Sequence, residues 1–188
     1  MRQQNIKRLL AFSAISQVGF MLVGITGFSA QAVESIIYFV IIYILSNVAA
    51  FMVVGAVAHV TDRETLEEYN GLYKTNPFQA IVMGISLLSL AGIPPTAGFF
   101  GKLFLLTSAV SSQMYVLLGI AAVNLVLSLY NFLRVIKYMF VDEATEEVPE
   151  VKSNIYEIAV YTFCVVGVMA IGFISPIYNY IQHIVAGG

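Results

Sequence analysis

The sequence predicts an all-α, polytopic membrane protein, a helical bundle with five spans, one of which is discontinuous. Three observations lead to this fold class. Of the 188 residues, 59% are hydrophobic and 11% are charged, whereas about 25% of the residues of soluble domains are charged. Apolar blocks near or above 20 residues recur along the whole chain, which is typical of membrane helices. The sequence does not show the roughly ten-residue alternating segments of a transmembrane β-barrel.

Four apolar segments predict uninterrupted spans, at about 9–28, 33–60, 114–140 and 155–182. The first follows a basic N-terminus and imitates a signal peptide, but its apolar run of 20 residues exceeds the usual length of about 7–15. We expect a retained span, with a cleaved signal peptide as the alternative. Residues 77–112 predict one discontinuous span, because a half of 15 residues covers only about 22 Å of a hydrocarbon core about 30 Å thick.

The discontinuous span is broken near 92–98, within the stretch SLAGIPPTAGFFGK. Pro94 and Pro95 end the first half-helix, while Gly92 and Gly98 allow an unwound turn. Unwound backbone at membrane depth must face protein or water and not lipid. A second half-helix is then expected to begin near the middle of the membrane.

Lysine and arginine residues are distributed unevenly across the five predicted spans. With five spans, eight of the nine fall on one side of the membrane, none falls on the other side, and Lys102 lies within the discontinuous span. With six spans, five of these eight residues would fall on one side and three on the other. The positive-inside rule favours five spans, with the N-terminus cytoplasmic and the C-terminus outside. The eight residues are Arg2, Lys7, Arg8, Arg63, Lys74, Arg134, Lys137 and Lys152.

Lys102 is predicted to lie at membrane depth, about one turn into the second half-helix. Ionisable groups at that depth usually face a bundle interior or an aqueous path. Desolvation and the positive end of the helix dipole both disfavour its charged form, so we expect a residue that gains and loses a proton. The alternatives are a lysine that snorkels to the interface and one that pairs with an acidic residue of a partner.

Neutral polar residues form one face on each of two other predicted spans. The spacings i, i+3, i+4 and i, i+4, i+7 place each set on one side of a helix. Such a face makes interhelical hydrogen bonds or lines a hydrated proton path; given Lys102, we expect the second role. The first face is Tyr43, Ser46 and Asn47, and the second is Asn124, Ser128 and Asn131.

The remaining ionisable groups predict no second site. Glu34, Glu157, His59 and His183 are expected at span ends, where hydration is available, and the lone Cys164 is expected to fill space between helices. The sequence shows no cysteine–histidine spacing typical of a metal site, no phosphate loop and no dinucleotide fingerprint. It also has too few basic residues for nucleic-acid binding.

Three motifs, in order, are NIKRLLAFSAISQVGFMLVG, LSLAGIPPTAGFFGKLFLL and SLYNFLRVIKYMF. Together they resemble the antiporter-like subunit N family of proton-pumping NADH–quinone oxidoreductase, respiratory complex I, whose mitochondrial counterpart is subunit 2. The resemblance extends to about Phe140. It implies two five-helix repeats, each with a discontinuous helix that bears a lysine. By this resemblance Lys102 is the proton-carrying lysine of the second repeat, and Lys7 matches a basic position with an accessory role.

The resemblance also implies that residues 1–188 form a single membrane domain, the C-terminal part of a longer subunit, in a bacterial inner membrane. NADH, FMN, iron–sulfur clusters and quinone are expected in partner subunits, and no cofactor or metal is expected on this chain. The expected partners are other membrane subunits of complex I, the missing N-terminal half and the lipid bilayer, without nucleic acid. Two alternatives are a subunit of a multi-subunit cation/proton antiporter and a non-pumping membrane scaffold.

Overall fold

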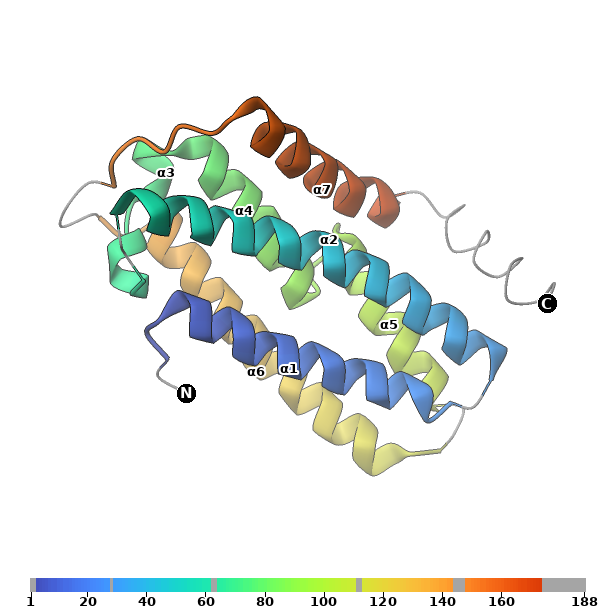
Figure 1. Ribbon diagram of the computed structural model, residues 1–188. Coiled ribbons are helices and arrows are strands. Elements are labelled where there is room, and N and C mark those ends of the chain that lie inside the picture. Colours follow the sequence, from blue (N-terminus) through green and yellow to red (C-terminus); the bar gives the residue numbers. More distant parts are fainter. Residues whose placement is uncertain (1–2, 28, 62–63, 111–112, 144–147, 174–188) are drawn as a thin grey trace.

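The chain folds as a bundle of helices in a computed structural model (Figure 1). The structure describes residues 3–27, 29–61, 64–110, 113–143 and 148–173. The helices in chain order are α1 (Ile6–Ile25), α2 (Ala30–Thr61), the 3-10 helix η1 (Leu66–Tyr69), α3 (Leu72–Thr75), α4 (Pro77–Ala91), α5 (Ala97–Val110), α6 (Tyr115–Phe140) and α7 (Ile155–Phe173).

The all-helical membrane fold is confirmed within the described residues. By length and composition, α1, α2, α6 and α7 are able to cross a membrane, whereas α4 and α5 are shorter apolar helices. α4 and α5 follow one another along α2 (Figure 1), as the two halves of a discontinuous span would. The count of five spans and the sidedness of the termini stay predictions. The last part of the predicted fifth span, residues 174–182, and His183 lie outside the described residues.

Two helices begin earlier than the apolar pattern predicts. α1 begins at Ile6, because the Asn5 side chain caps it by accepting a hydrogen bond from the Arg8 amide at 3.0 Å. α2 begins at Ala30, so Glu34 lies inside this helix. There the Glu34 side chain is buried, and its Oε2 has no hydrogen-bond partner in the described part of the chain. The expectation that Glu34 is hydrated at a span end is therefore wrong for this structure.

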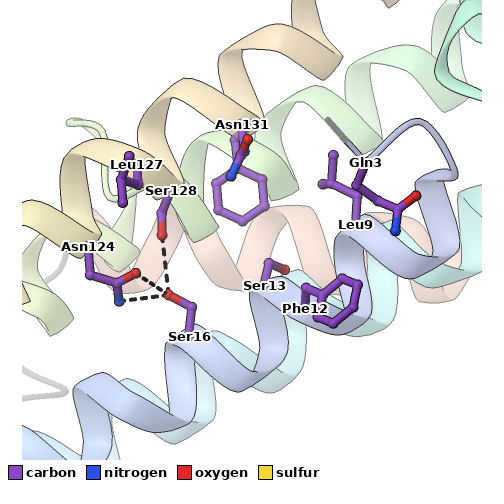
Figure 2. A pocket seen from close by; sticks show the side chains of 10 residues that line it. Gln3, Leu9, Phe12, Ser13, Ser16, Asn124, Leu127, Ser128 and Asn131 are labelled. Atoms are coloured by element: carbon purple, nitrogen blue, oxygen red, sulfur yellow. Dashed lines mark hydrogen bonds between the residues drawn. The ribbon is translucent and has the colours of Figure 1, made fainter. Parts of the chain in front are cut away.

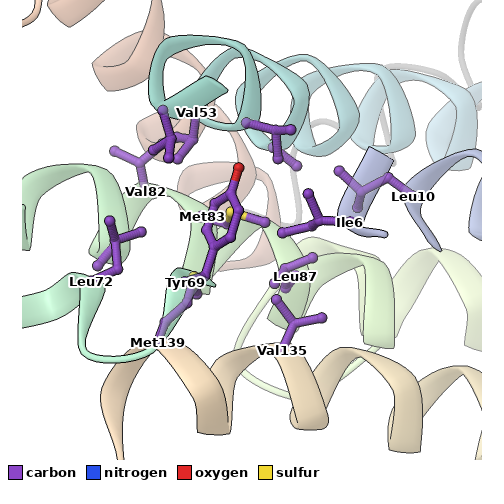
Figure 3. Packing of buried hydrophobic residues seen from close by; sticks show 14 of the residues in the cluster. Ile6, Leu10, Val53, Tyr69, Leu72, Val82, Met83, Leu87, Val135 and Met139 are labelled. Atoms are coloured by element: carbon purple, nitrogen blue, oxygen red, sulfur yellow. The ribbon is translucent and has the colours of Figure 1, made fainter. Parts of the chain in front are cut away.

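α2 is the central helix of the bundle and contacts α1, α4, α5 and α7 (Figure 1). The largest apolar cluster lies where the N-terminal part of α1 meets α2, α4 and α6 (Figure 3). Ile6, Leu10, Met83 and Val135 are fully buried in it. η1 adds Tyr69, whose burial raises its pKa, with smaller effects from the nearby carboxylates of Glu68 and Glu64. This packing anchors the polar loop after α2 to the end of the bundle.

A partly exposed ion pair joins that loop to the start of α1. Lys7 Nζ lies 2.7 Å from Glu64 Oε1, and Asn5 Nδ2 donates to Glu64 Oε2 at 2.7 Å. The backbone continues the tie, because the Ile6 amide donates to the Glu64 carbonyl at 2.8 Å. Lys7 therefore lies in a structural contact at one end of the bundle.

Acidification is expected to weaken this tie. The hydrogen bonds from Lys7 and then Asn5, with the charge of Lys7, lower the pKa of Glu64 below its ordinary value of 4.5. A carboxyl whose pKa is lower in the folded state stabilises the fold above its ordinary pKa, and the contribution disappears as the pH falls through the folded-state pKa. Between neutral pH and pH 4, thermal stability of the wild type should therefore fall slightly more than that of Glu64→Gln. Equal losses in the two proteins would contradict the prediction.

Candidate functional site: the interrupted helix and Lys102

The interruption between α4 and α5 leaves backbone carbonyls without helical partners. In a continuous helix the Leu90 carbonyl would accept a hydrogen bond from the amide of residue 94, but Pro94 has no N–H. α4 ends instead at Ala91 and is capped by Gly92, which has φ 80° and donates to the carbonyls of Leu88 and Ser89 at 3.1 and 3.0 Å. The prolines thus free the Leu90 carbonyl oxygen for a side-chain donor.

Two glycines and a third helix enclose the interruption. A Cβ on Gly98 would clash with the Ser89 carbonyl oxygen, so only glycine permits α5 to pass this close to the end of α4. On another side, a Cβ on Gly172 of α7 would lie 2.7 Å from the Pro95 carbonyl oxygen. α7 therefore packs directly on the unwound segment, which meets the requirement that such backbone face protein rather than lipid.

Lys102 occupies the space beside the freed carbonyl. Its side chain is 2% exposed, and its Nζ donates to the Leu90 oxygen at 2.6 Å. The Nζ also lies 5.0 Å from the centroid of the Phe20 ring, a cation–π distance. The aliphatic stem covers Gly92, where a Cβ would lie 3.0 Å from Lys102 Cδ. The sequence prediction that Lys102 lies deep in the bundle agrees with this position.

The partners of Lys102 are neutral. Neither ion pair found among the described residues includes Lys102. A buried ammonium needs hydrogen bonds or counter-charges to offset its lost hydration; here a carbonyl dipole and an aromatic face supply part of that compensation. The environment therefore does not contain the carboxylate that would hold the lysine permanently charged, within the part of the chain that the structure describes.

Gln17 is a member of this site that the sequence did not single out for a role. It lies on α1, is fully buried, and donates from Nε2 to the same Leu90 oxygen at 3.2 Å. The available signal was an amide side chain within an apolar run, next to Ser16. The sequence also predicts that Pro94 leaves the Leu90 carbonyl without a helical donor, but the packing of the bundle decides which side chains donate to it.

The predicted polar face of α2 reaches the interruption through one residue. Ser46 is fully buried and its Oγ donates to Ser89 Oγ at 2.8 Å, directly before Leu90 in α4. Tyr43 and Asn47 instead bond to each other, with Asn47 Nδ2 donating to the Tyr43 hydroxyl at 3.2 Å. Ser46 is therefore the residue of this face that contacts the helix interruption.

The predicted polar face of α6 lines a cavity of about 470 Å³ between α1 and α6 (Figure 2). Ser16 Oγ lies 2.9 Å from Oδ1 and 2.7 Å from Nδ2 of Asn124, and 3.3 Å from Ser128 Oγ. These hydrogen bonds of Asn124 and Ser128 go to α1 and not to Lys102. Asn131 and Ser13 also line the cavity. The α2 face therefore reaches the interruption through Ser46, whereas the α6 face forms hydrogen bonds with Ser16 of α1.

Comparison with known proteins shows the family to which this chain belongs. Residues 1–128 match the family described as NADH:quinone oxidoreductase/Mrp antiporter, TM. The chain belongs to this family. It is 44% identical to NADH-quinone oxidoreductase subunit N of Azobacteroides pseudotrichonymphae, over 99% of this chain and 39% of that protein. It is 38% identical to subunit N of Phocaeicola vulgatus, over 95% of this chain and 38% of that one.

Two solved structures have the same fold as this chain. A chain of respiratory complex I from Thermus thermophilus with bound Aureothin superposes with a TM-score of 0.78 at 29% identity, over 91% of this chain and 38% of that one. A chain of the Mrp complex from Dietzia sp. DQ12-45-1b gives 0.86 at 21% identity, over 99% and 43%, which shows the fold alone. The resemblance to subunit N drawn from the three motifs is confirmed. The chain spans about two-fifths of the length of these first two curated relatives.

Proposed function

We propose that this chain provides half of a proton path across the membrane in an NADH–quinone oxidoreductase, with Lys102 as the proton carrier. The observation that carries the proposal is a buried lysine at a helix interruption whose hydrogen bond goes to a neutral carbonyl, Leu90 O. Membership in the NADH:quinone oxidoreductase/Mrp antiporter family supports it. The redox chemistry of NADH, FMN, iron–sulfur clusters and quinone is assigned to partner subunits.

The site is suited to a lysine that alternates between charged and neutral forms. A carboxylate partner would favour the ammonium strongly, whereas a carbonyl oxygen accepts a hydrogen bond from an ammonium or from a neutral amine. In the charged state the carbonyl and the Phe20 ring stabilise Nζ. Release of one proton to water leaves a neutral amine that still fits the same pocket. The protein therefore needs no large rearrangement of the pocket between the two states.

Water along the two polar faces would connect Lys102 to the membrane surfaces. Ser46 contacts the interruption from α2, and the α6 face lines a cavity large enough for several water molecules. With the N-terminus cytoplasmic, release from this half is directed to the outer face of a bacterial inner membrane. The remaining part of the longer subunit and neighbouring membrane subunits would supply the rest of the path.

A cation/proton antiporter subunit is the second candidate function. The matching family includes Mrp antiporters by description, and the Dietzia Mrp chain has the same fold. The two functions differ in their energy source. Proton translocation that depends on NADH oxidation and quinone reduction supports the first, whereas sodium–proton exchange without NADH, in a complex that lacks NADH dehydrogenase subunits, supports the second.

Lys102→Met is expected to reduce NADH-driven proton translocation roughly tenfold or more, because a positioned acid–base group typically contributes at least that factor to a proton transfer. The assay uses the complex purified with this subunit and reconstituted into vesicles, and proton uptake is normalised to assembled complex. Lys74→Met is the matched control, since Lys74 is an exposed lysine of α3. A wild-type proton-to-NADH ratio in Lys102→Met would exclude Lys102 as the carrier and support a scaffold.

A further inference from the structure

We propose that Gln17 is a positioning residue for Lys102: it holds the water through which Lys102 exchanges protons with the cavity between α1 and α6. The inference rests on the proposed role of Lys102 as a proton carrier. It goes beyond that role because it selects one of the two polar faces as the route to the lysine. It also assigns a function to a side chain that carries no charge.

The first observation is a shared acceptor. Lys102 Nζ and Gln17 Nε2 both donate to the Leu90 oxygen, at 2.6 and 3.2 Å. The two nitrogens therefore lie within two hydrogen-bond lengths of each other. A carbonyl oxygen has two lone pairs, so both donors are accommodated, and Gln17 keeps a donor on this carbonyl whichever protonation state Lys102 has.

The second observation is an unpaired acceptor on the same amide. Gln17 Oε1 is buried and has no hydrogen-bond partner among the described residues. Exchanging the amide oxygen and nitrogen would not resolve this, because Oε1 would then face the Leu90 oxygen, and two acceptors repel each other. A buried polar atom without a hydrogen-bond partner destabilises the fold. A water molecule between Gln17 Oε1 and one of the remaining N–H groups of Lys102 would satisfy both.

The third observation is the position of Gln17 relative to the cavity. Ser13 and Ser16 of α1 line the cavity with Asn124 and Ser128 (Figure 2). Gln17 follows Ser16 directly and lies one turn after Ser13, so its side chain leaves α1 on the adjoining side. Gln17 thus has the polar cavity lining on one side and the Leu90 carbonyl, with Lys102, on the other.

The proton balance is simple. A charged Lys102 breaks one Nζ–H bond and gives the proton to the water bound at Gln17 Oε1, which gives one of its own protons to water in the cavity. Lys102 is left as a neutral amine, and the reverse sequence recharges it. The Gln17 amide stays neutral throughout, so it orients the water without titrating.

The test measures NADH-driven proton uptake per assembled complex for Gln17→Leu, Gln17→His and a control. Gln17→Leu keeps the size but removes both polar atoms, and we expect about a tenfold lower translocation rate, the effect of one hydrogen bond lost from a transfer step. Gln17→His keeps one donor and one acceptor and should restore most of the rate. Gln79→Leu is the control, because Gln79 is also buried but donates to Val151 O at 2.9 Å, away from the site; it should lower stability and keep the wild-type rate.

The outcomes separate this inference from the proposed function. A wild-type rate in Gln17→Leu, with a defective Lys102→Met, overturns the role of Gln17 alone. Equal defects in Gln17→Leu and Gln17→His overturn it as well, since a donor and an acceptor would then be insufficient. If Gln17→Leu does not assemble, Gln17→Met, which is flexible and lacks a strong donor or acceptor, replaces it. A wild-type rate in Lys102→Met refutes the proposed function instead.

Discussion

Lys102→Arg is expected to abolish most proton translocation even though it keeps the positive charge. An arginine guanidinium does not lose its proton in proteins, whereas a lysine ammonium does so readily when buried. If Lys102 carries protons, a permanent cation beside Leu90 blocks the cycle in its charged state. We expect a fall of about 100-fold in NADH-driven proton uptake, within the usual range for loss of a proton-transfer group.

This substitution separates a proton carrier from a static cation. A lysine that only pairs with a partner's carboxylate would be replaced well by arginine and poorly by methionine. If Lys102 is a proton carrier, neither arginine nor methionine would replace it. Lys74→Arg, at an exposed position of α3, is the matched control, and rates are normalised to assembled complex. Wild-type pumping by Lys102→Arg would refute the carrier role and favour an ion pair.

Gly98→Ala is expected to disrupt the interrupted helix itself. Its Cβ would overlap the Ser89 carbonyl oxygen and approach Ser89 C to 2.7 Å, and backbone atoms at a helix end cannot move aside as a flexible side chain can. Overpacking of this kind costs roughly 3 kcal/mol of unfolding free energy. Thermal unfolding of the purified protein in detergent should show a clear loss of stability, together with reduced assembly.

Gly55→Ala is the control for this prediction. Gly55 lies inside α2, and a Cβ there would meet no atom within 4 Å beyond the adjoining backbone of its own helix. Alanine has the higher helix propensity, so the substitution should leave stability unchanged or raise it by up to about 1 kcal/mol. If both variants unfold at the wild-type temperature, α4 and α5 do not approach each other as closely as the structure shows.

Much of this protein was predictable from sequence because membrane helices have strong compositional signals. The apolar blocks located the helices to within a few residues. Pro94, Pro95 and Gly92 predicted an interruption near residues 92–98, and in the structure it lies between Ala91 and Ala97. A proline has no N–H wherever it lies in the fold, and that local fact is enough to end a helix and free a carbonyl.

The errors occurred where local capping or packing decides. Asn5 caps α1 earlier than the apolar run begins, and α2 continues back past Glu34, which becomes buried. The accessory role expected for Lys7 stays a prediction; in the structure Lys7 pairs with Glu64 at the end of the bundle. The cap of α1 is a local hydrogen bond, but the burial of Glu34 and the pairing of Lys7 depend on partners in space, and hydropathy along the chain contains no record of such partners.

The sequence by itself determined the class of the protein, its family and the place of the helix interruption, because composition, motif order and proline chemistry are local properties. Only the tertiary structure decided which side chains meet there. It set Lys102 on the Leu90 oxygen, added Gln17 to the same oxygen, and directed the Asn124 face toward α1. A freed carbonyl can accept a donor from any helix that approaches it, and which helix does so is fixed by the packing of the whole bundle.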